Sequence, residues 1–195
     1  MRVNEIFYSL QGEGAMQGEA MVFVRLSGCN LACPFCDTRH EAWVEMSEEE
    51  VVAEVLRYPS LWVLLTGGEP ALQPLAGLVD RLHAVGRRVA VETNGTVAID
   101  AAVDWVCVSP KGEWLGAEAQ VVRQRVDEVK VLYDGEHEPQ GYWEELGHEA
   151  QRSLQPMDVG ERERNAELVA AAVEYVKGHP EWRLSMQIHK MIGIR

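Results

Sequence analysis

Seven short runs of mostly apolar, often β-branched residues recur along the chain, and longer amphipathic stretches separate several of them. Near-continuous apolar character is typical of strands that are covered on both faces of a parallel sheet. The alternation of such strands with helices predicts a parallel sheet with right-handed crossovers. The predicted strands cover residues 21–26, 61–66, 88–93, 105–109, 128–133, 153–157 and 183–187.

Three helices are predicted between these runs. Ser47 and Glu50 form a capping box that opens a helix through about Arg57. The second helix covers residues 72–85, and the third and longest covers residues 161–177 with an apolar stripe on one side. A glycine follows each of the last two helices, as is typical of a helix C-terminus.

The length of 195 residues and the hydrophobic fraction of 47% predict a single domain that spans residues 1–195. A complete eightfold barrel takes roughly 250 residues. We therefore expect a shortened, open barrel of about six strand–helix units, that is, an α/β fold of the (β/α)6 partial TIM barrel type. A flat, doubly wound sheet is the alternative.

Charge and termini limit the class of partner. The formal net charge of −13 disfavours binding to a nucleic-acid backbone, which requires clustered Lys and Arg. The first residues contain no basic segment followed by an apolar one, and no run of about 18 apolar residues occurs. We expect a cytoplasmic protein that binds neither nucleic acid nor membrane.

Polar and glycine-containing segments follow five of the predicted strands. In a barrel, the carboxyl ends of the strands form the active face, so these segments are expected to meet at one opening. They cover residues 67–70, 92–95, 109–111, 155–158 and 187–190.

Three of the four cysteines, Cys29, Cys33 and Cys36, lie in a loop that follows the first of these strands. Soft thiolate ligands select zinc or an iron–sulfur cluster. His40 would complete a Cys3His zinc site, although zinc ligands rarely all come from a segment this short. A four-iron cluster on three cysteines leaves one iron open to a small molecule.

The segment CNLACPFCDT (residues 29–38) resembles the CxxxCxxC signature of radical S-adenosylmethionine enzymes. Residues 67–70, GGEP, are similar to a second motif of that superfamily, which contacts the methionine amino group of the cofactor. Backbone must approach a ligand closely there, which suits glycine. The resemblance implies a radical SAM type of partial barrel with the cluster loop at residues 29–38.

Further stretches resemble the 7-carboxy-7-deazaguanine synthase (QueE) family over nearly the whole chain. They are YSLQGEG (8–14), CDT (36–38), ETNG (92–95) with SPK (109–111), and QPMD (155–158). That resemblance implies a radical SAM lyase that converts 6-carboxy-5,6,7,8-tetrahydropterin to 7-carboxy-7-deazaguanine with loss of ammonia. It also implies catalytic use of S-adenosylmethionine, a 4Fe–4S cluster, Mg²⁺, and a place in queuosine and 7-deazapurine biosynthesis that feeds tRNA modification or other deazapurines.

The resemblance also assigns residues. Cys29, Cys33 and Cys36 are the expected cluster ligands, and Thr38 is the expected Mg²⁺ ligand. A planar guanidinium suits bidentate binding of the substrate carboxylate, which is the role expected of Arg25. The other expected substrate contacts are Leu10, Gln11, Gly12, Glu13, Thr66, His189 and the terminal Arg195, and the expected S-adenosylmethionine contacts are Gly67, Gly68, Glu69, Ser109, Pro110, Lys111, Gln155, Pro156, Met157 and Asp158.

Two other functions remain open at this point. One is an activase that installs a glycyl radical on another protein, and the other is a non-catalytic Cys3His zinc module. For the synthase we expect a flavodoxin- or ferredoxin-type reductant and a homodimer, because a shortened barrel leaves strand edges to cover.

Overall fold

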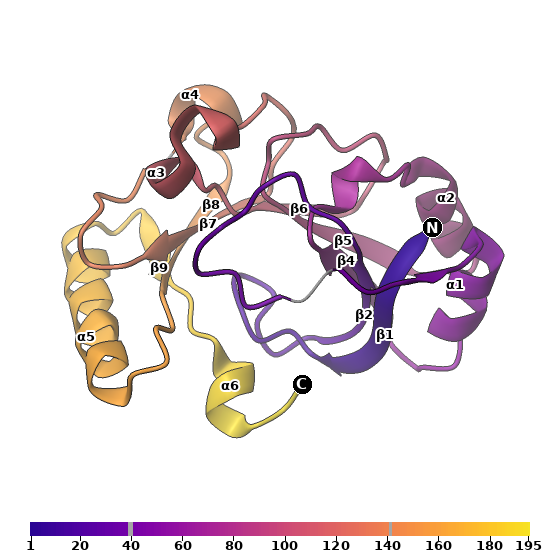
Figure 1. Cartoon of the computed structure of the whole chain (residues 1–195), viewed down its shortest axis with the longest axis horizontal. Coiled ribbons are helices and arrows are strands. Elements are labelled where there is room, and N and C mark those ends of the chain that lie inside the picture. Colours follow the sequence, from indigo (N-terminus) through magenta and orange to yellow (C-terminus); the bar gives the residue numbers. More distant parts are fainter. Residues whose placement is uncertain (39–40, 141) are drawn as a thin grey trace.

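The structure is a computed structural model of the chain and describes residues 1–38, 41–140 and 142–195. Within these residues one nine-stranded sheet has the order β3-β1-β2-β4-β5-β6-β7-β8-β9 (Figure 1). The strands are β1 (Arg2–Leu10), β2 (Ala20–Leu26), β3 (Val44–Glu45), β4 (Trp62–Gly67), β5 (Arg88–Thr93), β6 (Trp105–Val108), β7 (Glu128–Tyr133), β8 (Gln151–Pro156) and β9 (Trp182–Leu184).

In the sheet, β2 is followed by β4 and then by each later strand up to β9 in chain order, and all of these neighbours pair in parallel. Strand β1 pairs antiparallel with both β2 and β3. A doubly wound sheet reverses its strand order at a switch point. No reversal occurs among the parallel strands of the described chain, so the flat alternative is wrong. The sheet is not closed, because β3 and β9 form opposite edges, and the shortened, open α/β barrel is confirmed.

Three longer helices cover the sheet. Figure 1 shows α1 (Glu48–Val55) and α2 (Ala76–Ala84) at one end and α5 (Arg162–Gly178) at the other. Each turns buried apolar side chains inward, which gives the barrel its hydrophobic core. The remaining helices are short: α3 (Gly112–Leu115), α4 (Trp143–Leu146), α6 (Ile188–Ile192) and the 3-10 turns Pro70–Leu72 and Gly116–Ala119.

The helix boundaries differ most from the sequence prediction at the start of the second helix, whereas the other ends differ by one or two residues. The capping box of Ser47 and Glu50 is present and opens α1, as predicted. The helix predicted from Leu72 instead begins at Ala76, after a 3-10 turn. Pro74 is the cause, because a residue before proline avoids the helical region, and Gln73 is extended with φ −117° and ψ 148°.

The two chain ends also differ. Strand β1 is absent from the prediction, and a register shift between Val3 and Glu5 interrupts its pairing with β2. The strand predicted at residues 183–187 is shorter, because β9 ends at Leu184 and the chain then turns into α6. No helix among the described residues is both long and apolar enough to cross a membrane.

Candidate active site

The carboxyl ends of the strands surround a cavity of about 630 Å³, a size typical of small-molecule sites. Segments from both ends of the chain line it, so the polar segments that follow the strands do meet at one opening. Nineteen of the predicted site residues lie in its wall: Leu10, Gln11, Gly12, Glu13, Arg25, Cys29, Cys33, Cys36, Thr38, Thr66, Gly67, Gly68, Ser109, Lys111, Gln155, Met157, Asp158, His189 and Arg195.

The cysteine loop leaves β2 and directs its three thiols to this cavity. The amide of Leu31 donates to Cys29 Sγ at 3.4 Å, and the amide of Cys36 donates to the carbonyl of Cys33 at 3.2 Å. Burial raises the pKa of the Cys29 and Cys33 thiols. Metal binding deprotonates a coordinating thiol. The positive charge of a bound cluster would therefore stabilise the thiolates that burial alone disfavours.

Gly67 and Gly68 bring β4 against that loop. The φ of Gly67 is +133°, a conformation that other residues rarely adopt. A β-carbon on Gly68 would stand 2.6 Å from the carbonyl carbon of Gly28 and 3.1 Å from Cβ of Cys29. Both positions therefore require glycine for the close approach of the two backbones.

Glu69 lies behind the cavity rather than in its wall. Its carboxylate is fully buried and accepts hydrogen bonds from Thr93 Oγ1 at 2.8 Å, from the Asn94 amide at 2.7 Å and from the Ala71 amide at 2.9 Å. Burial raises the pKa of Glu69 although these bonds oppose the shift. The side chain thus ties the end of β4 to the end of β5.

Lys111 lies beside the cluster loop. Its Nζ donates to the carbonyl of Ser109 at 2.7 Å and to Ser109 Oγ at 2.6 Å. Burial lowers the pKa of Lys111 to about 8. The residues 109–111 therefore present an ammonium and a hydroxyl together at the end of β6.

One residue of β7 and one residue directly after β9 anchor the loop that follows β1. The amide of Ala15 donates to Glu128 Oε1 at 2.9 Å, and the amide of Gly14 donates to Ser185 Oγ at 2.7 Å. Glu128 and Ser185 are both buried, so the loop is fixed to β7 and to the end of β9. This anchoring holds Gln11 and Glu13 at the cavity.

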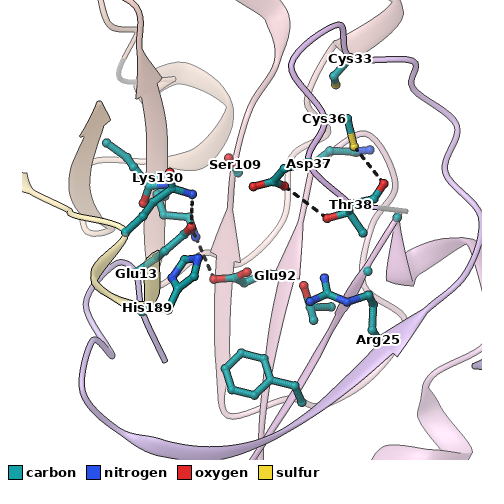
Figure 2. Close-up of a pocket in the computed structure, with 18 of the residues that line it drawn as sticks. Glu13, Arg25, Cys33, Cys36, Asp37, Thr38, Glu92, Ser109, Lys130 and His189 are labelled. Atoms are coloured by element: carbon teal, nitrogen blue, oxygen red, sulfur yellow. Dashed lines mark hydrogen bonds and ion pairs between the residues drawn. The ribbon is translucent and has the colours of Figure 1, made fainter. Parts of the chain in front are cut away.

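One wall of the cavity contains an ammonium between two carboxylates. Lys130 Nζ lies 2.6 Å from Glu13 Oε2 and 2.9 Å from Glu92 Oε1 (Figure 2). Burial alone raises the pKa of Glu13, but the Lys130 charge and hydrogen bonds outweigh it and hold that pKa at about 2. Glu13 is therefore an ionised acceptor near neutral pH, and Glu92 accepts a hydrogen bond from the same ammonium.

Arginines occupy another part of the wall. Arg25 Nε donates to Glu5 Oε1 at 2.8 Å, and Arg195 pairs with the other oxygen of the same carboxylate. Both guanidinium groups lie over the ring of Phe7, at 5.8 Å for Arg25 and 4.6 Å for Arg195. The terminal carbonyl oxygen of Arg195 accepts from Ser9 Oγ at 2.6 Å, so the chain end is held on β1.

The C-terminal segment also reaches the cysteine loop. Lys190 Nζ lies 3.2 Å from Asp37 Oδ2 and 3.0 Å from Asp158 Oδ2. Thr38 Oγ1 is 3.5 Å from Asp37 Oδ1, and Figure 2 shows both residues across the cavity from Lys130. Helix α6 therefore bridges the loop after β2 and the loop after β8.

Three predicted cofactor contacts, Glu69, Pro110 and Pro156, are not among the cavity-lining residues of the described chain. The inward hydrogen bonds of Glu69 account for its position, and both prolines are buried at strand ends. Conversely, Lys130 lines the wall although no role was predicted for it, whereas Glu92 and Gln187 also line the wall and belong to segments that were predicted to meet at the opening. A lysine inside the apolar run EVKVLY was the one local signal for Lys130.

The donor set distinguishes two kinds of metal group. Among residues 1–38, 41–140 and 142–195, no three His, Cys, Asp or Glu side chains are grouped to hold a single metal ion. His40, the fourth ligand of the zinc alternative, lies outside the described residues. The three cysteines that line one cavity supply the three thiolates that a four-iron cluster with one open iron requires.

Comparisons with known proteins identify the superfamily and the family. The radical SAM superfamily model matches residues 23–112. The chain is 48% identical to 7-carboxy-7-deazaguanine synthase of Bacteroides thetaiotaomicron over 100% of this chain and 98% of that protein. It is 42% identical to the enzyme of the same name from Bradyrhizobium diazoefficiens, over 99% and 98% of the two chains.

A solved structure agrees with these sequence relatives. QueE from Escherichia coli superposes with a TM-score of 0.71 and 27% identity, covering 95% of this chain and 92% of that one. The similarity extends over the whole chain, which supports the synthase over an activase or a zinc module. The cofactors are thus a 4Fe–4S cluster, S-adenosylmethionine and Mg²⁺. The chain belongs to the 7-carboxy-7-deazaguanine synthase family of radical SAM enzymes.

Proposed function

We propose that this cavity converts 6-carboxy-5,6,7,8-tetrahydropterin to 7-carboxy-7-deazaguanine with loss of one ammonia. The observation that carries the proposal is the arrangement of three chemistries around one cavity. The thiols of the cysteine loop, the Arg25 guanidinium and the carboxylates beside Lys130 all line it. They match, in turn, a cluster, an anionic carboxylate and a hydrogen-bond-donating ring edge.

The proposed substrate contacts pair groups of opposite charge. Arg25 uses Nε for Glu5, and in the proposal its two Nη groups bind the pterin carboxylate as a fork. Thr38 would hold Mg²⁺, and because a hydroxyl is a weak Mg²⁺ ligand, substrate oxygens and waters would supply the other ligands. Gln11 and Glu13 bind the pyrimidine edge, while Leu10, Gly12, Thr66, His189 and Arg195 surround the ring.

The cofactor end lies at the strand ends β4, β6 and β8. Cys29, Cys33 and Cys36 would ligate the cluster, and Gly67, Gly68, Ser109, Lys111 and residues 155–158 would hold S-adenosylmethionine. Glu69 supports this site by fixing Asn94, whose Nδ2 lies 3.9 Å from Cys29 Sγ. In this enzyme class the cluster and S-adenosylmethionine supply a 5′-deoxyadenosyl radical that removes a hydrogen atom from substrate.

The chain itself orients the reactants and limits solvent access. Helix α6 adds His189 and Lys190 to the wall, and Lys190 links the loops after β2 and β8 through its ion pairs with Asp37 and Asp158. Exclusion of water protects a reactive intermediate from side reactions. The Glu13 and Glu92 carboxylates hold the donor edge of the ring, and Arg25 fixes its orientation.

The quaternary and cellular parts of the proposal follow from the open sheet and from the family. One domain, residues 1–195, acts in the cytoplasm, receives electrons from a flavodoxin- or ferredoxin-type protein, and forms a homodimer that covers a sheet edge. Light scattering tests the last point. A single 21.8 kDa species would contradict the homodimer.

Turnover by reconstituted protein tests the function. The protein is loaded anaerobically with iron and sulfide, then incubated with dithionite, Mg²⁺, S-adenosylmethionine and the carboxylated tetrahydropterin. Mass spectrometry is expected to detect 7-carboxy-7-deazaguanine. Cleavage of S-adenosylmethionine without this product would show that the substrate is wrong.

A further inference from the structure

The side chain of Lys130 is buried in the middle of β7, with 5% of its surface exposed. A buried ammonium is costly unless opposite charges compensate it. Glu13 and Glu92 supply that compensation from the loop after β1 and from β5. The three side chains therefore form a charged group that joins segments 117 and 38 residues away from the lysine.

Amide side chains complete the group. Gln187 Nε2 donates to Glu13 Oε1 at 2.7 Å, and Gln11 Nε2 donates to Glu92 Oε1 at 3.1 Å. The amide of Glu13 donates to Gln11 Oε1 at 3.1 Å. Each carboxylate is thus held from two directions, while both glutamates and the lysine still line the cavity.

One positive charge compensates two negative ones, so the group carries a net charge of −1. We propose that Lys130 is a positioning residue that keeps Glu13 and Glu92 as ionised acceptors and thereby selects a ligand edge rich in N–H donors. An ionised carboxylate only accepts hydrogen bonds, whereas a protonated one also donates. The 2-amino-4-oxo edge of a pterin matches this wall, and the inference rests on the proposed function.

A ring edge that carries oxygen in place of the 2-amino group presents a hydrogen-bond acceptor where the pterin presents a donor. A 2,4-dioxo ring turns an acceptor toward the carboxylates and leaves buried polar atoms unpaired. Sites built to bind an N–H reject an analogue that lacks it far more strongly than apolar pockets reject a change in size. Lys130 therefore affects specificity without being required to touch the ligand.

Removal of the lysine changes the protonation of the wall. Burial then raises the pKa of Glu13 without the opposing ammonium, and two neighbouring carboxylates cannot both ionise easily. Cys107 of β6, Lys111 after β6, Glu128 of β7 and His189 of α6 are the other titratable side chains near this group. The Nζ of Lys111 donates to Ser109 and not to Glu13 or Glu92, so it does not replace Lys130.

Equilibrium binding tests the proposal without turnover. The probes are 6-carboxypterin and 6-carboxylumazine, which carries oxygen at position 2, titrated by fluorescence into anaerobically reconstituted protein with S-adenosylmethionine and Mg²⁺. The variants are Lys130→Met, the double variant Lys130→Met with Glu92→Gln, and the control Lys177→Met on the exposed face of α5. The double variant restores the net charge of −1. Iron content and circular dichroism verify that each variant folds.

The wild type and Lys177→Met are expected to prefer the pterin by about tenfold or more. Lys130→Met should lose about tenfold in affinity for the pterin and reduce the preference to about threefold or less. Its affinity should rise from pH 6 to pH 8 as Glu13 ionises, whereas the wild type stays constant. The double variant should recover about threefold or more.

A folded Lys130→Met protein that keeps the wild-type preference would overturn the assignment. So would a pH-independent loss of affinity that the double variant does not recover, because a purely structural lysine predicts that result. If the wild type binds neither probe, the proposed function falls together with the assignment.

Discussion

Gly12 and His189 are packed so closely that a β-carbon on Gly12 would overlap the imidazole ring and stand 2.9 Å from Cβ of His189. The amide of Ile188 also donates to the carbonyl of Gly12 at 3.0 Å, so the two segments cannot easily separate. Residues 177 positions apart thus define one side of the substrate cavity. The position of α6 depends on the absence of a side chain at residue 12.

The variant Gly12→Ala should displace His189 and α6 while the cluster loop stays intact. We expect the KM for the pterin to rise by about tenfold or more, since a displacement of about 1 Å can cost up to about a hundredfold. Iron content should not change. The matched control is Gly178→Ala at the end of α5, because no atom lies within 4 Å of a β-carbon at that position and its φ is not positive. Equal KM values for both variants would contradict the packing argument.

Cys33→Ala should abolish cluster assembly and all turnover, because two thiols cannot hold the cluster. Iron analysis after anaerobic reconstitution measures the loss. Cys107→Ala is the control, since Cys107 is buried in β6 and 3% exposed. The control should keep its iron and lose about 1 kcal/mol of unfolding free energy. Full iron content in Cys33→Ala would refute its role as a ligand.

Arg25→Ala should weaken binding of 6-carboxypterin by about tenfold to a hundredfold, the range of a charge-assisted hydrogen bond. Binding of pterin without the carboxylate should change little. Glu5→Gln should have a smaller effect, because it loosens Arg25 and Arg195 without removing either. Calorimetry measures the affinity of each variant, and of the wild type, for both ligands. An equal loss for both ligands in Arg25→Ala would rule out the pairing with the carboxylate.

Thr38→Ala should retain the cluster but require more Mg²⁺ for the same stimulation of turnover. Thr38→Ser keeps the hydroxyl and should keep the stimulation. A neutral hydroxyl is a weak Mg²⁺ ligand, so the expected change is a shift of the Mg²⁺ dependence to higher concentration. A Mg²⁺ titration at fixed substrate concentration checks it, and the unchanged curve of Thr38→Ala would retire the assignment.

Much of the barrel could be predicted because its signal is local. A strand buried on both faces, such as RVAVET, identifies itself by its apolar run, and β5 has the predicted bounds. Strand β1 gives a weaker signal, because the shift between Val3 and Glu5 breaks its alternation. The helix start at Ala76 could have been placed from Pro74.

The features of the site that lie in short motifs could be predicted, whereas those that depend on contacts between distant segments could not. The cysteine spacing and the two glycines of GGEP lie in short motifs, and the structure directs both to the cavity. The environment of Lys130 could not be predicted, because its partners come from two distant segments that only the folded sheet brings together. For Glu69, the inward hydrogen bonds to Thr93 and Asn94 likewise depend on the neighbouring strand.

Direct hydrogen transfer requires that substrate and S-adenosylmethionine lie side by side in this one cavity. The most direct measurement uses 6-carboxytetrahydropterin deuterated at C6 with reduced, reconstituted protein, followed by mass spectrometry of the recovered S-adenosylmethionine and 5′-deoxyadenosine. Deuterium is expected at the 5′ carbon, together with formation of 7-carboxy-7-deazaguanine. Unlabelled S-adenosylmethionine and 5′-deoxyadenosine, recovered while S-adenosylmethionine is being cleaved, would contradict direct transfer.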